Sequence, residues 1–149
     1  MFAIVVVIAS SGCLDGGSSA KDMAKMVPED ASRFGHFDFQ TMRDDKDLEE
    51  ISEEMMEGDD LDALGVDRYD INHMAVVSGE EEGDYELVIL KGNFDLEDVR
   101  DELDDADFDE DEYKGIEIWK RASWLGRDFA IAISGDTLII GNKDSVKDC

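Results

Sequence analysis

The sequence predicts an α+β fold built on an antiparallel sheet. Two segments carry apolar residues at the i, i+3 and i+7 positions of an amphipathic helix, and apolar runs typical of strands flank them. The last two runs are joined by Gly135 and Asp136, the two-residue turn of a tight hairpin. The order β-α-β-β-α-β-β-β predicts a sheet with both helices on one face, as in ferredoxin-like split folds.

The first half of the predicted domain contains a strand over 33–39, a helix over 48–55 that is followed by a stop at Gly65, and an antiparallel hairpin over 74–78 and 85–91. The strand 85–91 is apolar on both faces, so we expect it inside the sheet. The face of the sheet opposite the helices is then not fully exposed to solvent. We expect that face to dock onto a protein partner, a missing C-terminal domain or a ligand.

The second half begins with a helix over 96–103, which Asp95 caps and which carries Leu96, Val99 and Leu103 on one face. Three further segments are predicted after it: the acidic loop 104–112, a strand over 115–120, and a hairpin formed by 129–134 and 137–141.

The two helices belong to a possible internal repeat. Residues 47–55 and 95–103 match in pattern except at Ser52 and Arg100, at a spacing of 48 residues, and a third copy begins at 141. The alternative is that any two acidic amphipathic helices look alike. Because a helix starting at 144 has barely one turn before the last residue, we expect the third helix to be truncated and the chain to be a fragment.

The N-terminus has the pattern of an export signal. Residues 2–9 form an eight-residue apolar run, too short for a bilayer span of about 20 residues, and Ser10, Ser11, Gly12 and Cys13 follow. This motif resembles the lipobox of exported prokaryotic lipoproteins. The alternative is a buried first strand with Cys13 in the core, but the Gly/Ser stretch after Cys13 suits a tether better.

The resemblance implies a division of the chain into a signal peptide (1–12), a lipidated Cys13 with a flexible tether (13–27), and an acidic α+β domain (28–149). Cys13 would carry a diacylglycerol that anchors the protein to the lipid bilayer, facing outside the cytoplasm. The domain also resembles exported lipoprotein domains of unknown function, which open with a Val-Pro-x-Asp-Ala element like the one that begins at Val27. No catalytic residue comes with either resemblance.

The charge excludes one class of partner. With 40 Asp and Glu against 14 Lys and Arg, the net charge is −26, so we expect no nucleic acid partner. The common nucleophile, phosphate-loop, dinucleotide and zinc-protease motifs are absent from the sequence, and we expect no catalytic residue and no cofactor.

Three groups of residues are weak candidates for a site. Alternating carboxylates in the acidic loop, on the type of loop that calcium favours, make Asp105, Asp107, Asp109 and Asp111 candidate metal ligands, although the loop departs from the EF-hand pattern. Trp124 is a candidate ligand contact, whereas core packing is favoured for Trp119. His36 and Asp38 share a strand face, an arrangement that could bind a metal or act as acid and base. The favoured alternative is that His36 and His73 are partly exposed residues that do not meet, because the first strand is expected at the centre of the sheet and His73 at an edge.

Three hypotheses about function follow from these features. The first is a membrane-tethered extracytoplasmic lipoprotein domain with a non-enzymatic binding or structural role at the cell envelope. The second is a calcium-dependent adhesion or sensing module that uses the loop 104–112. The third is a hydrolase whose active site lies beyond the fragment.

The composition predicts a fold that requires salt. Asp outnumbers Glu by 25 to 15 and there are only 8 Lys, a balance typical of proteins kept soluble in high salt. Since the Debye length falls to about 3 Å at 1 M, salt screens the repulsion among carboxylates. We expect the thermal midpoint of unfolding to rise with added NaCl, whereas a flat response would leave the acidity without this explanation.

Overall fold

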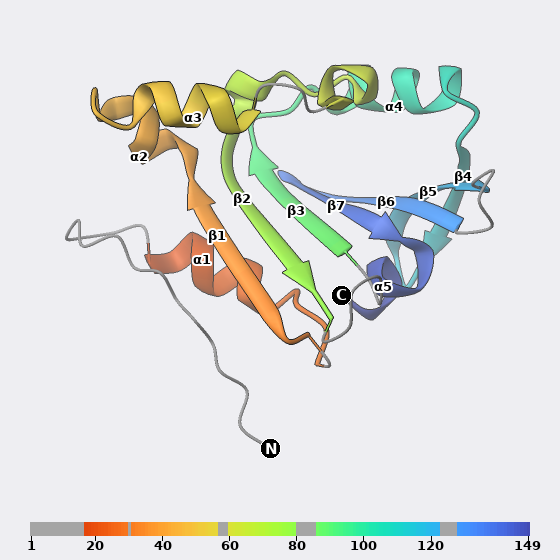
Figure 1. Ribbon diagram of the computed structural model, residues 1–149. Helices are drawn as coiled ribbons and strands as arrows, with labels where there is room; N and C mark the ends of the chain where they lie inside the picture. The colour runs from red at the N-terminus through yellow and green to blue at the C-terminus, as the bar shows by residue number, and fades with distance from the viewer. Residues whose placement is uncertain (1–16, 30, 57–59, 80–85, 123–127) are drawn as a thin grey trace.

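The computed structural model describes residues 17–29, 31–56, 60–79, 86–122 and 128–149. These residues form one seven-stranded antiparallel sheet with helices on both faces, which is an α+β fold (Figure 1). The predicted signal peptide, the lipobox with Cys13, and Trp124 lie outside the described residues.

The strands lie in the sheet in the order β1-β2-β3-β7-β6-β5-β4, and every neighbouring pair is antiparallel. Their bounds are β1 Arg33–Asp38, β2 Ile71–Ser78, β3 Glu86–Gly92, β4 Asp109–Tyr113, β5 Ile116–Ala122, β6 Asp128–Ser134 and β7 Thr137–Asn142. The helices are α1 Gly17–Ala24, α2 Phe39–Asp44, α3 Glu49–Met56, α4 Leu96–Asp105 and α5 Lys143–Asp148, with short 3-10 turns at Asp60–Leu64 and Arg68–Asp70.

The strand order differs from a ferredoxin-like split. That arrangement places the first strand at the centre, but β1 is an edge strand paired only with β2 among the described strands. The reason is that the segment carrying α2 and α3 returns the chain antiparallel beside β1. A split βαβ unit would instead need a crossover to a parallel strand.

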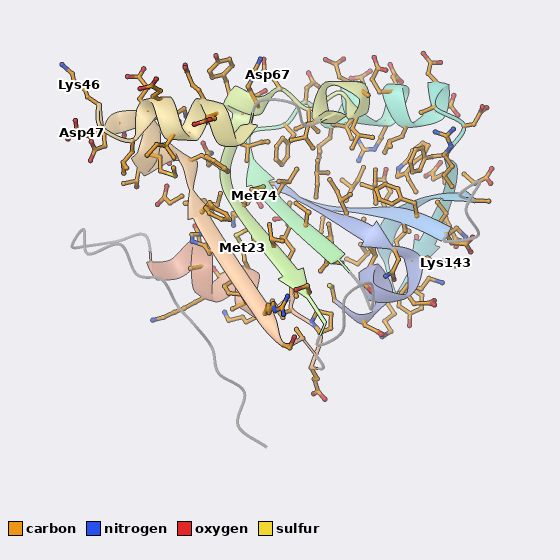
Figure 2. The ribbon with its side chains drawn as sticks, viewed as in Figure 1. Met23, Lys46, Asp47, Asp67, Met74 and Lys143 are labelled. Carbon is orange, nitrogen blue, oxygen red and sulfur yellow. The ribbon has the colours of Figure 1, made fainter. Side chains whose placement is uncertain are left out.

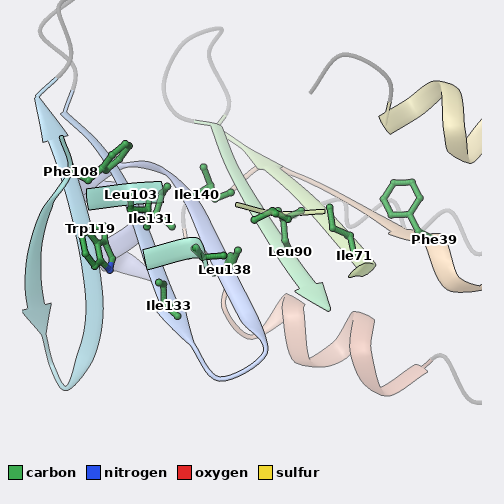
Figure 3. Close-up of a cluster of buried hydrophobic side chains, with 12 residues drawn as sticks. Phe39, Ile71, Leu90, Leu103, Phe108, Trp119, Ile131, Ile133, Leu138 and Ile140 are labelled. Atoms are coloured by element: carbon green, nitrogen blue, oxygen red, sulfur yellow. The ribbon is translucent and has the colours of Figure 1, made fainter. Parts of the chain in front are cut away.

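The interior position of β3 is confirmed, since β3 pairs with β2 on one side and β7 on the other. Its side chains enter two separate cores. Leu90 belongs to one core on the side of α2 and α4, which extends to Leu103, Phe108 and Trp119 (Figure 3). Leu87 and Ile89 face the opposite core. Strand alternation therefore divides one apolar strand between two packed layers.

The second face of the sheet is covered by helices of the same chain. α5 contacts β6 and β7, and α1 contacts β2, on the side opposite α3 and α4 (Figure 1). Met23 of α1 is fully buried and Val146 of α5 is 4% exposed, both in the second core. The stretch 13–27, expected as a flexible tether, thus contains a helix docked on the sheet.

A partly exposed, bidentate ion pair joins α4 to β5. Arg100 donates from Nε and Nη2 to the two carboxylate oxygens of Glu117, both at 2.8 Å, and Trp119 donates from Nε1 to Glu117 at 2.7 Å. Hydrogen bonds from Arg100 hold the pKa of the Glu117 carboxyl below its usual range. A bidentate pair of this kind fixes orientation as well as distance. It also anchors a strongly acidic helix to the sheet through its one basic residue.

The two copies of the predicted repeat pack differently in the structure. Asp95 caps α4 as predicted, and Val99 is 1% exposed, whereas the matching Ile51 of α3 is 47% exposed. α3 packs on α2 rather than directly on the sheet. The third helix is capped by Asn142 and packs on the other face of the sheet. The shared sequence pattern therefore does not produce equivalent packing.

Candidate functional site

A pair of histidines lies on the α1 side of the sheet. His36 of β1 and His73 of β2 are stacked, with ring centroids 5.5 Å apart and planes at 23°. The prediction that they do not meet is wrong, because β1 lies at the edge and pairs directly with β2. Strand alternation places His73 on the same face as Ala75 and Val77, whereas a register irregularity between Ile71 and His73 leaves Ile71 in the opposite core.

Both imidazoles have a nitrogen without a hydrogen-bond partner in the described part of the chain. These atoms are Nε2 of His36 and Nδ1 of His73, and both are buried. The nearest carboxylate oxygen is Oδ1 of Asp38, 3.7 Å from Nδ1 of His73, which is too long for a hydrogen bond. The side chain of His73 is 12% exposed, so water reaches this pair from a restricted direction.

The pair belongs to a row of polar residues that crosses the sheet. Asp38 lies opposite His73, and His73 lies opposite Lys91 on β3. Nζ of Lys91 is 3.5 Å from the carboxylate of Asp136, in the turn between β6 and β7. Carboxylate, imidazole, ammonium and carboxylate therefore alternate across the strands, on the face that carries the second apolar core.

Helix α1 brings another charged residue to this row. A hydrogen bond from Lys25 lowers the pKa of the Asp22 carboxyl, and the charge of Lys91 lowers it further. Asp22 of α1 is thus within electrostatic range of Lys91. The site is bounded by the sheet below and by the helix next to the predicted lipidated residue.

The surroundings of His36 disfavour its charged form. Burial lowers the pKa of the His36 imidazole, the neighbouring His73 lowers it further, and Asp38 acts in the opposite direction. The geometry is that of a stacked histidine pair near the sheet edge, in which the neutral form of His36 is favoured.

The four candidate calcium ligands are distributed over different elements. Asp105 ends α4, Asp107 has a left-handed φ of 60°, and Asp109 and Asp111 lie on β4. Asp111 is engaged by Lys120 of the neighbouring strand, and the hydrogen bond from Lys120 lowers the pKa of its carboxyl. Among the described residues, no group of three or more His, Cys, Asp or Glu side chains is placed to hold a metal ion.

The segment 104–112 is therefore not the single loop that was predicted. Its second half is the edge strand β4, whose alternating carboxylates point to opposite faces of the sheet. Charged side chains on an exposed edge discourage pairing with another chain. This role accounts for the carboxylates of residues 109–112, of which Asp109 and Asp111 share one face of β4.

The remaining sequence candidates have distinct surroundings. Trp119 is 6% exposed and lies in the core, as favoured from the sequence. The Cys149 thiol donates to the backbone oxygen of Ser145 at 3.4 Å. Burial of the thiol, with the nearby Asp148, raises the pKa of Cys149 to about 11. The thiolate needed for nucleophilic chemistry is thus disfavoured at neutral pH.

No family model, no curated protein and no solved structure matches this chain. In the part of the chain that the structure describes, no helix is long and apolar enough to cross a membrane.

Sequence reasoning missed the histidine pair and the polar row. One signal was present in the sequence: His36 and Asp38 are two residues apart and therefore share a strand face. The sequence does not show that β1 pairs with β2, so His73 could not be identified as the neighbour of His36.

We expect the pKa of the His36 imidazole in the folded state to lie below its usual value of about 6.5. The neutral ring therefore contributes stability that is complete above about pH 6.5. This stability is lost as the pH falls through the folded-state pKa. Proton NMR titration of the imidazole should give a midpoint below about 6.5.

Substitution His36→Phe provides the control, since it keeps a ring beside His73 and removes the titration. The free energy of unfolding of the unsubstituted chain should fall relative to that of H36F between about pH 7 and pH 5. A constant difference across that range, or a His36 midpoint above the usual value, would contradict the assignment.

Proposed function

We propose that the protein is a lipid-anchored extracytoplasmic domain with a non-enzymatic binding or structural role at the cell envelope. The observation that carries the proposal is the sequence of residues 2–13, an apolar run that ends in Ser10, Ser11, Gly12 and Cys13. Small residues before a cysteine are what cleavage and lipidation at Cys13 require.

The position of α1 supports this proposal. α1 begins at Gly17, four residues after Cys13, and Met23 near its end is fully buried in the second core. A lipid anchor at Cys13 would thus be joined to the folded domain by a very short connection. Such a connection holds a domain close to the bilayer instead of letting it range over a long linker.

The surface charge supports a role in binding or spacing. α3 and α4 together carry ten carboxylates and one basic residue, Arg100. The folded domain therefore presents a densely negative helical layer, which attracts cationic partners and repels anionic polymers. Under this proposal, that layer is the surface that the anchored domain offers at the cell exterior.

Cells fed labelled palmitate provide the test. The unsubstituted protein should carry the label, and Cys13→Ser should abolish it because the acylated sulfur is removed. Cys149→Ser is the matched control and should keep the label, since these two are the only cysteines in the chain. Absence of label from the unsubstituted protein, or its retention in C13S, would refute the anchor.

A further inference from the structure

Charge is divided unequally between the two helical layers. α3 and α4 contain four and six carboxylates respectively, with Arg100 as the one basic side chain. α1 and α5, on the other face of the sheet, contain three lysines and three aspartates. The sheet therefore separates a strongly acidic helical layer from one with balanced charge (Figure 1).

Most of the lysines lie on the side of α1 and α5. Lys143 begins α5 and lies far from Lys46 and Asp47, which lie between α2 and α3 (Figure 2). Lys91 and Lys120 share strand faces with residues of the second core, Ile89 and Ile118. Seven of the eight lysines lie on this side, which we call the lysine face: Lys21, Lys25, Lys91, Lys114, Lys120, Lys143 and Lys147.

Aspartates offset the charge of the lysine face, so that it is close to neutral instead of basic. Lys25, Lys91, Lys120 and Lys143 each form an ion pair with an aspartate. Nζ of Lys114 and Nζ of Lys147 lie 4.9 and 5.0 Å from the ring centroid of Tyr113. These contacts hold the ammonium groups close to the surface of the sheet.

The predicted anchor lies near the same face. Four residue steps separate Cys13 from Gly17, the first residue of α1, and a fully extended chain advances at most about 3.6 Å per residue. Cys13 is therefore within about 14 Å of the start of α1. Because α1 is fixed to the sheet by the buried Met23, this short connection ties the predicted anchor to the helix that covers the second face.

We infer that the lysine face is turned toward an anionic lipid surface, and that the α3 and α4 layer is turned away from it. This inference rests on the proposed lipid anchor. An anionic bilayer repels the carboxylates of α3 and α4, and at 0.1 M salt that repulsion extends over about 10 Å. The anchor and the charge distribution favour the same orientation.

Two single-label variants test the orientation. Asp144→Cys places a thiol on exposed α5, and Asp101→Cys places one on exposed α4, each in a Cys149→Ser background. The two substitutions remove the same charge. The anchored protein is reconstituted on vesicles of phosphatidylcholine and phosphatidylglycerol, and a fluorophore on each thiol is quenched by a nitroxide on the lipid headgroup.

We expect the quenching constant at position 144 to exceed that at position 101 about twofold or more at 0.1 M salt, with a smaller difference at 1 M salt as the repulsion is screened. Equal quenching at the two positions, or stronger quenching at position 101, would overturn the inference.

Flotation of the vesicles separates this outcome from failure of the anchor. If the protein does not float with the vesicles, lipidation is refuted. The orientation is then tested in a second preparation, in which a hexahistidine segment replaces residues 1–13 and binds a nickel-chelating lipid. The same order of quenching in that preparation would support the orientation, and the reverse order would overturn it.

Discussion

The fold depends on a sheet whose central strands are apolar on both faces. Leu87 and Ile89 of β3 enter one core, while Leu90 enters the other, and the neighbouring β7 divides Ile139 and Leu138 between the same two cores. Such a sheet is stable in water only if both faces are covered. α2 and α4 supply cover on one side, and α1 and α5 on the other.

This need for cover explains how a chain with a net charge of −26 folds around an extensive core. Carboxylates are placed on the outer surfaces of helices and on the edge strand β4, while the helices contribute a few apolar residues inward. α4 is the clearest case, because Val99 and Leu103 are buried and Arg100 is bound by Glu117. The acidity is thereby confined to surfaces that the core does not use.

Segments with a complete local signal were predictable from the sequence. The Asp95 cap and the spacing of Val99 and Leu103 predicted α4. Gly135 predicted the turn between β6 and β7, and its φ is 59°. Gly65 likewise ends the turn before β2 in a left-handed conformation, and a Cβ at this position would lie 2.9 Å from the backbone oxygen of Asp98. The helix cap, the helix spacing and the turn glycines rest on residues close together in the chain, whereas the approach of Gly65 to Asp98 joins distant residues.

Features set by long-range pairing were not predictable. β4 consists of Asp, Glu and Tyr residues with no apolar alternation, and it is a strand because β5 pairs with it. Ile51 occupies the helical position that matches Val99, yet it is half exposed because α3 packs on α2. The meeting of His36 and His73 depends on β1 lying at the edge beside β2. Local pattern predicted the two hairpins β2–β3 and β6–β7, but it does not show which strands from distant parts of the chain become neighbours.

The central claim is that α1 is part of the fold and completes the cover of the second face. Measurement of the free energy of unfolding by urea denaturation for Met23→Ala tests it most directly, with Ile51→Ala as the control. Because Met23 is fully buried and Ile51 is 47% exposed, M23A should cost about 2–5 kcal/mol and I51A much less. A loss for M23A no larger than that for I51A would contradict the account.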